Sequence, residues 1–67
     1  MIKAIYSKHA NDKRILYRFS KEQIETVIKR GATSKQTDGY LTAYKEIKVA
    51  YKKINKETYY IKTIYID

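Results

Sequence analysis

The pattern of apolar and polar residues changes in character near the middle of the chain. Through Arg30 it suits helices, in which apolar residues recur every three or four positions. From Ala32 onward, β-branched and aromatic residues take over and alternate with polar ones, as in half-buried strands. Because the helical pattern comes first and the strands follow, the sequence predicts an α+β fold: two N-terminal helices packed on a three- to four-stranded antiparallel sheet.

The first helix is predicted over about Lys8 to Tyr17, after a short opening strand at residues 2–6. The apolar side of this helix is predicted to contain Ile15, Leu16 and Phe19. Arg14 and Arg18 fall on the other side. A helix this short depends on packing against the rest of the domain for its stability.

The second predicted helix carries local signals at both of its ends. Ser20 is a suitable N-cap, and Gln23 three residues later completes a capping box. Gly31 is predicted to end the helix in a left-handed conformation. The buried stripe of this helix is predicted to consist of Ile24, Val27 and Ile28.

The second half of the chain is predicted to form strands at residues 40–45, 47–54 and 59–66. Asp38-Gly39 is a hairpin-turn signal before the first of these strands, and Asn55-Lys56 suits a turn before the last. The alternation predicts the residues that share one face within each strand: Tyr40, Thr42 and Tyr44 in the first, and Ile47, Val49 and Tyr51 in the second. The last strand is apolar on both sides, which predicts a central strand covered on both faces.

The amino-acid composition favours partners that carry phosphate groups. The 67 residues contain 15 Lys and Arg against 7 Asp and Glu, a formal net charge of +8. AT-rich codons would also enrich Lys, Ile, Tyr and Asn, so the charge alone does not identify a partner. The length fits one domain over residues 1–67. Without cysteine, a long apolar stretch or a signal-peptide pattern, we expect a cytoplasmic protein that binds no membrane and no metal.

The candidate chemistry of this sequence is metal-free and needs no cofactor. RNA can be cut in this way because its own 2′-hydroxyl attacks the neighbouring phosphate, given a base, an acid and cations for the developing charge. We predict four catalytic residues: His9, Lys13, Arg14 and Arg18. His9 would move the proton, and the two arginines would clamp a phosphate. The alternatives are a packing or capping role for His9 and a solvated basic surface for the arginines.

Four further residues are predicted to contact RNA: Lys8, Lys48, Lys52 and Tyr65. The lysines would bind phosphates, and an exposed tyrosine would stack on a base or donate a proton. About six of the eight tyrosines are expected to serve packing, because aromatic cross-strand pairs stabilise sheets.

Ser7-Lys8-His9-Ala10 opens the first predicted helix with a Ser/Thr-Lys-His-Ala motif. Later matching segments are Phe19-Ser20, Gln23-Ile24, Val27-Ile28, Asp38-Gly39, Val49-Ala50-Tyr51 and Thr63-Ile64-Tyr65. In these segments the chain resembles, over nearly its whole length, a family of short domains related to the RelE and BrnT toxins. Lys13 stands at the first basic position of the family, Tyr17 replaces the second, and Arg18 takes the usual Gly position.

The resemblance implies a RelE-like fold and an mRNA endoribonuclease that acts on ribosome-bound message and is held inactive by an acidic antitoxin-like protein. Two other functions remain open at this point. One is a catalytically silent nucleic-acid-binding module, which would bind with a steep salt dependence and form no product. The other is a small basic protein that docks on an acidic subunit.

Overall fold

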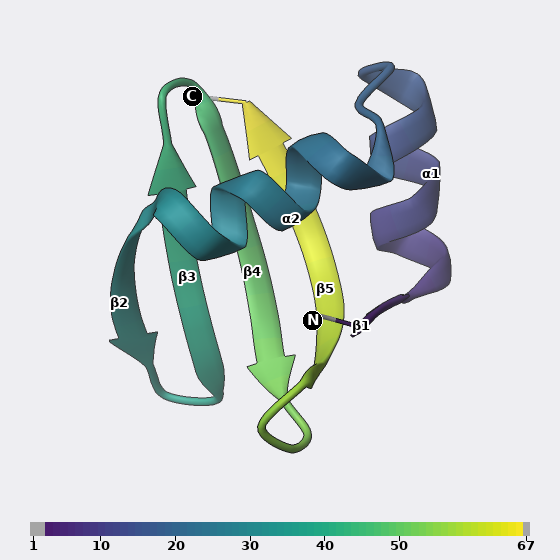
Figure 1. The fold of residues 1–67 in the computed structure, drawn as a ribbon. Helices are drawn as coiled ribbons and strands as arrows, with labels where there is room; N and C mark the ends of the chain where they lie inside the picture. Colours follow the sequence, from purple (N-terminus) through teal and green to yellow (C-terminus); the bar gives the residue numbers. More distant parts are fainter. Residues whose placement is uncertain (1–2, 67) are drawn as a thin grey trace.

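The computed structural model describes residues 3–66, which form two helices and five strands (Figure 1). In chain order the elements are β1 (Lys3–Tyr6), α1 (Lys8–Leu16), α2 (Lys21–Arg30), β2 (Ala32–Gln36), β3 (Gly39–Tyr44), β4 (Ile47–Lys53) and β5 (Thr58–Ile66). The predicted α+β class is confirmed. Of the opening strand predicted at residues 2–6, Ile2 lies outside the described residues.

The strands form a single mixed sheet in the order β1-β5-β4-β3-β2. β1 runs parallel to β5, and the other neighbouring pairs are antiparallel. The prediction of a three- to four-stranded antiparallel sheet is therefore wrong at both edges. The edge strand β2, Ala32–Gln36, has no large apolar residue and is exposed throughout, so no hydrophobic alternation marks it in the sequence. The other edge strand, β1, is parallel to β5, and the two helices and three strands between them in the chain provide the long connection that parallel pairing needs.

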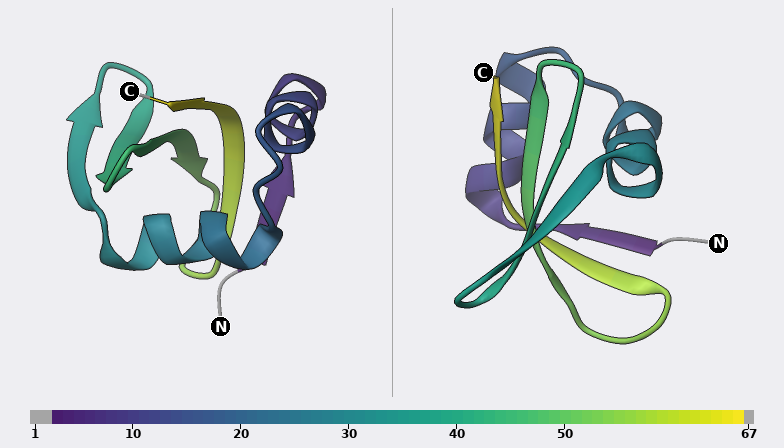
Figure 2. Two further views of the ribbon diagram at one scale, coloured as in Figure 1. Left: turned by 90° about the horizontal axis from the view of Figure 1, so that it is seen from above. Right: turned by 90° about the vertical axis from the view of Figure 1, so that its left-hand side faces the viewer.

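Helix α2 lies across one face of the sheet, as the view from above shows (Figure 2). Its capping box forms as predicted. The Ser20 hydroxyl accepts from the backbone nitrogen of Gln23 at 3.1 Å, and the side-chain oxygen of Gln23 accepts from the backbone nitrogen of Ser20 at 2.7 Å. The predicted stripe is buried, and the core consists of Ala10, Ile24, Val27, Ile28, Val49, Tyr51, Ile61 and Ile64. The core therefore sits between α2 and one face of the sheet.

Gly31 ends α2 for a different reason from the one predicted. Its φ of −74° is not left-handed but extended. A Cβ atom at this position would collide with the Thr42 hydroxyl and with the carbonyl oxygen of Val27. Glycine is needed here because the chain passes tightly between the end of the helix and β3.

Helix α1 stands at the edge of the sheet beside β5, with its sides assigned differently from the prediction (Figure 1). Ala10 is completely buried, whereas Ile15 and Leu16 are 59% and 69% exposed. The helix ends at Leu16, so Phe19 packs on the core from the following segment and not from the helix. Periodicity alone placed the large apolar residues inward, but the close contact with β5 requires the small side chain of Ala10.

Ser7 fixes the start of α1 against the sheet. Its hydroxyl accepts from the Ala10 nitrogen at 3.0 Å and donates to the Lys62 carbonyl oxygen at 2.9 Å. The N-cap of the helix is thereby bonded directly to β5. This connection explains why such a short helix holds a definite position at the sheet edge.

The predicted turns are confirmed, and β5 contains an irregularity that the sequence does not reveal. Gly39 has a φ of +104° beside the Asp38 turn, the conformation that favours glycine. In β5, Ala50 pairs with Thr63 but the next residue of β4, Tyr51, pairs with Ile61, which leaves Lys62 as a bulge. The bulge keeps both Ile61 and Ile64 on the core side although they are three residues apart.

The last strand is central, as predicted, but it is covered on one face only. β5 lies between β1 and β4, and Ile61 and Ile64 are fully buried under α2. Tyr60 and Tyr65 lie on the other face and are 36% and 43% exposed. Within the described residues, no helix is long and apolar enough to span a bilayer.

Candidate nucleic-acid interface

The sheet face turned away from α2 is solvent-accessible, and we call it the open face. Side chains alternate between faces along each strand, so the neighbours of the buried residues Thr42, Val49 and Ile64 point to this side. The open face is formed by Leu41, Lys48, Ala50, Lys52, Tyr60, Lys62, Thr63 and Tyr65. Helix α1 flanks it at the β5 edge, while α2 lies behind the sheet (Figure 2).

Lysines and tyrosines are neighbours across strands on the open face. Lys48 of β4 is paired in register with Tyr65 of β5, and Lys52 is paired with Tyr60. Side chains of directly opposed residues on one face lie about 5 Å apart at their Cβ atoms. The open face therefore presents two cation–aromatic pairs, which are separated along the strands by the Ala50–Thr63 pair. Three of the predicted RNA contacts, Lys48, Lys52 and Tyr65, belong to this surface.

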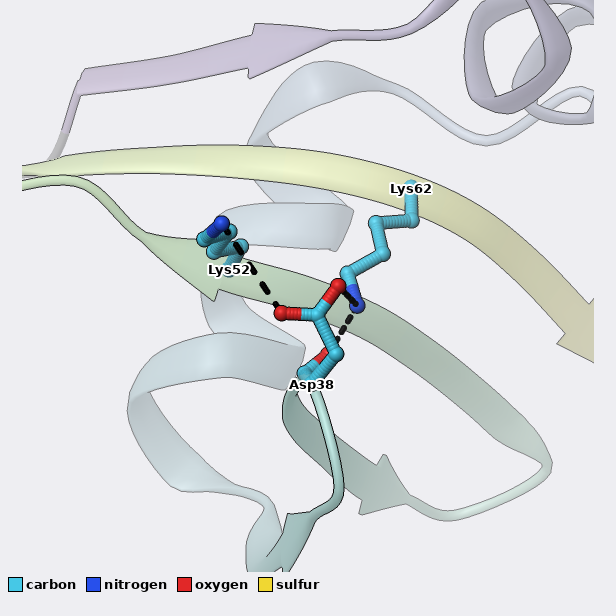
Figure 3. A network of polar contacts seen from close by, with 3 residues as sticks. All are labelled: Asp38, Lys52 and Lys62. Carbon is cyan, nitrogen blue, oxygen red and sulfur yellow. Dashed lines mark hydrogen bonds and ion pairs between the residues drawn. The ribbon is translucent and has the colours of Figure 1, made fainter.

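The bulge adds a third lysine, which contacts the turn between β2 and β3. The ammonium group of Lys62 donates to the backbone carbonyl oxygen of Asp38 and lies 3.5 Å from the Asp38 carboxylate. The Lys52 ammonium lies 3.8 Å from the other oxygen of the same carboxylate. Figure 3 shows the two lysines converging on Asp38 from β4 and β5. Asp38 thus lies between two cations of the open face.

Arg14, one of the four predicted catalytic residues, is engaged inside the fold. Its guanidinium donates to the Phe19 carbonyl oxygen at 3.0 Å and to the Asn11 side chain at 3.1 Å. It also lies over the Tyr6 ring, 5.5 Å from the ring centroid. Because Tyr6 packs against the core under α2, Arg14 points to the α2 side of the helix.

His9 and Lys13 lie on the opposite side of α1 from Arg14. Each residue of an α-helix is rotated by about 100° around the helix axis from the one before it. Viewed along the axis of α1, Arg14 lies about 40° from the buried Ala10 in one direction. Lys13 lies about 60° and His9 about 100° from Ala10 in the other direction. Since Arg14 faces the α2 side, Lys13 and His9 face the side of the open face. Lys13 is half-buried and donates to the Tyr17 hydroxyl at 3.3 Å, whereas His9 is exposed.

The remaining two basic residues predicted in this region lie at the surface. Lys8 is exposed in the first turn of α1, and Arg18 is exposed beyond the end of the helix with a φ of +60°. The structure therefore brings His9 and Lys13 to one side of α1, Arg14 to the other, and Arg18 to the connection with α2. The four predicted catalytic residues do not converge on one point, and their catalytic roles stay predictions.

The tyrosines separate into the two groups that the sequence predicts. Six pack in or against the core: Tyr6, Tyr17, Tyr40, Tyr44, Tyr51 and Tyr59. Burial raises the pKa of Tyr6, against an opposing effect of Arg14, and burial also raises the pKa of Tyr51. Both of these phenols lie on the core side, away from the open face. Tyr60 and Tyr65 are the exposed pair.

Sequence reasoning missed Tyr60 and Lys62 as members of this surface. Tyr60 and Tyr65 are five residues apart, so strict alternation assigns them to opposite faces of a strand. The bulge at Lys62 shifts the alternation by one residue and brings both rings to the open face. Nothing in the local sequence, which lacks glycine from Tyr40 onward, marks this bulge.

The titratable side chains offer no metal-ligand cluster in the described residues: no three His, Cys, Asp or Glu side chains gather there. Comparison of the chain with protein-family models, with curated proteins and with solved structures finds no match.

Proposed function

We propose that this protein binds single-stranded RNA on the open face of its sheet. The observation that carries the proposal is the placement of two lysine–tyrosine pairs, Lys48–Tyr65 and Lys52–Tyr60, on an uncovered sheet surface. Single strands are bound by cations that follow the phosphates and by aromatic rings on which the bases stack. Both kinds of group are present: the lysines lie along β4, and the tyrosines lie opposite them on β5.

The geometry of the sheet favours an unpaired strand over a duplex. Lys48 and Lys52 are four residues apart on β4, which corresponds to about 13 Å along the strand. Opposite them on β5, the exposed rings of Tyr60 and Tyr65 are available to bases whose faces are free. In a duplex the bases are already stacked on one another, so these rings would find no partner. The formal net charge of +8 adds a general attraction for the phosphate backbone.

A test of the RNA proposal compares three variants by fluorescence anisotropy with a labelled single-stranded RNA of mixed sequence. Tyr65→Ala should weaken binding by about 5- to 100-fold, the range for loss of one stacked base. Lys52→Gln should weaken binding and reduce the slope of log affinity against log salt by at most about 0.7, the value for one phosphate contact of a single strand. Lys29→Gln is the matched control, because it removes the same charge from an exposed position of α2.

The control decides where the RNA lies. If Lys29→Gln weakens binding as much as Lys52→Gln does, the attraction is spread over the whole protein and the open face is not the site. Unfolding curves of all three variants establish that the changes in affinity are not losses of folded protein.

A second candidate function is metal-free cleavage of the bound RNA, favoured by the exposed position of His9 on the side of α1 that borders the open face. In this reaction the 2′-oxygen attacks the adjacent phosphorus and the bond from phosphorus to the 5′-oxygen breaks, which leaves a 2′,3′-cyclic phosphate. His9 would take the 2′-hydroxyl proton or give a proton to the departing oxygen, and Lys13 would stabilise the phosphorane charge. The resemblance to RelE- and BrnT-related toxins supports this candidate and suggests ribosomes and an acidic antitoxin-like protein as partners.

The cleavage candidate is tested on the same RNA with chelator present, by following the appearance of cyclic-phosphate ends. His9→Ala should abolish product formation, while Ile15→Ala, a change at an exposed position of the same helix, should leave the rate within about twofold. Full-rate cleavage by the His9→Ala protein would remove His9 from the mechanism. Tight binding without product would leave the RNA-binding module as the function.

A further inference from the structure

Asp38 holds two lysines of the open face at one point. Its carboxylate oxygens lie 3.8 Å from the Lys52 ammonium and 3.5 Å from the Lys62 ammonium. The Lys62 side chain reaches this position from the bulge of β5, across β4, to the start of β3 (Figure 3). A Cβ atom on Gly39 would lie 3.2 Å from the Lys62 ammonium nitrogen, so the absent side chain at Gly39 leaves room for this arrangement.

These ion pairs contribute little to the stability of the fold. The side chain of Asp38 is 73% exposed, that of Lys52 is 60% exposed and that of Lys62 is 32% exposed, so Asp38 is open to water in both pairs. Ion pairs at such exposure are weak because water and salt screen them and because long side chains lose freedom when they pair. The arrangement does bring two ammonium groups together around one small anion with two acceptor oxygens. The same arrangement also binds a phosphate.

We propose that Lys52 and Lys62 form a phosphate subsite, which the Asp38 carboxylate occupies in the free protein and which a phosphodiester of the bound RNA takes over. This inference rests on the RNA-binding function proposed above. It adds Lys62 to the binding surface, and it assigns the Asp38 carboxylate as a competitor of the RNA phosphate. The Asp38 carboxylate and an incoming phosphate are both negatively charged, so they repel each other and compete for the same two ammonium groups. Asp38 therefore lowers the affinity for RNA and selects for ligands that contact enough of the open face to displace it.

Displacement also changes how binding depends on salt. In the wild-type protein the two ammonium groups are already paired, so the incoming phosphate replaces a carboxylate and fewer bound ions are released. Without the carboxylate, each freed lysine contributes to the salt slope, by about 0.7 per phosphate contact for a single strand. Loss of the Asp38 charge should thus make binding both tighter and more sensitive to salt.

The test is the affinity of a labelled single-stranded RNA for Asp38→Asn and for Glu22→Gln, measured from about 50 mM to about 200 mM salt. Both variants raise the net charge by one, but Glu22 is an exposed residue of α2, behind the sheet. Asp38→Asn should bind about fivefold more tightly at the low-salt end, the effect of one unit charge about 4 Å away in water. Glu22→Gln should change the affinity by less than about twofold, since salt screens the more distant charge.

Asparagine is as suitable as aspartate at this turn position, so Asp38→Asn should fold normally. Because an Asn-Gly step can deamidate back to an acid, its mass is checked before use, and Asp38→Ser serves as a second charge-free variant. Equal affinities of Asp38→Asn and Glu22→Gln for RNA that the wild-type protein does bind would overturn the subsite and leave RNA binding on the open face intact.

Binding of tripolyphosphate tests the phosphate subsite independently of RNA binding. Its binding is followed through the NMR signals of the lysine side-chain CH₂ groups next to the ammonium. The signals of Lys52 and Lys62 should move at lower tripolyphosphate concentration in Asp38→Asn than in Glu22→Gln. That result, with no RNA binding by any variant, would retain the phosphate subsite and overturn RNA as its ligand. If the lysine signals respond equally in both variants, the subsite is overturned.

Discussion

Replacing Arg14 by alanine should destabilise the protein much more than replacing Arg18 by alanine. The two residues are one helical turn apart in sequence, and both were candidates for contacting phosphate. In the structure Arg14 donates to the Phe19 carbonyl oxygen and to the Asn11 side chain and covers the Tyr6 ring. Arg18 is exposed. The same loss of one positive charge therefore removes several contacts in one case and none of these contacts in the other.

The magnitude follows from the contacts that Arg14 loses. Two hydrogen bonds from a charged donor contribute about 1.5 kcal/mol each at the lower end of their range, suited to a half-buried group. The contact with the Tyr6 ring adds about 0.5–1 kcal/mol. Against this, the Arg14 Nε atom is buried without a hydrogen-bond partner among the described residues, and its removal returns about 1 kcal/mol. The net loss is about 2.5–3 kcal/mol.

A loss of this size is large for a domain of 67 residues, whose whole unfolding free energy is on the order of 3–10 kcal/mol. Urea unfolding followed by circular dichroism measures it, with Arg18→Ala as the matched control, expected within about 0.5 kcal/mol of wild type. RNA affinity is then compared at conditions where both variants are folded. Equal stability of the two variants would refute the structural role of Arg14. A specific loss of RNA affinity in folded Arg14→Ala would return this residue to the binding surface.

Two further predictions concern stability. Arg18 has a left-handed φ of +60°, which is costly for a residue with a Cβ atom, so Arg18→Gly should raise the unfolding free energy by about 0.5–1 kcal/mol in the same urea assay. An equal gain in Arg18→Ala would show that charge and not backbone strain is the cause. Burial raises the pKa of Tyr6 and Tyr51, so the unfolded chain loses these protons near pH 10 while the folded chain retains them. Stability should therefore be complete below about pH 10 and decline as the pH rises through the folded pKa values, and Tyr51→Phe should make this decline less steep.

The elements that the sequence predicts best are those whose local signals and tertiary contacts agree. In α2, the Ser20–Gln23 capping box, the apolar stripe and the sheet beneath it all favour the same helix. In β3 and β4, alternation assigns Thr42 and Val49 to the core correctly because neither strand is interrupted. In these elements the periodicity of the helix or strand alone is enough to predict which side chains are buried.

Prediction fails where a contact from a distant part of the chain outweighs the local pattern. Ala10 is buried and Leu16 exposed because α1 meets β5 at close range, and no periodicity within the helix reports that distance. β2 is held in the sheet by its pairing with β3 and not by apolar side chains of its own. For the candidate site, alternation along β4 assigns Lys48 and Lys52 to one face, but it does not relate them to Tyr65 on another strand. Lys62 and Tyr60 depend on a bulge that only strand pairing creates.

The position of the tyrosines says more about function than the number of lysines does. A biased codon usage would enrich lysine and tyrosine alike, but it would not determine which face of the sheet carries an uncovered ring. Six tyrosines pack in or against the core, where an aromatic ring stabilises the fold. Tyr60 and Tyr65 gain less from burial, and both lie in register with a lysine. Serine or threonine at these two positions would keep the strand and remove exposed apolar area, so the rings themselves are the feature that a base-stacking function explains.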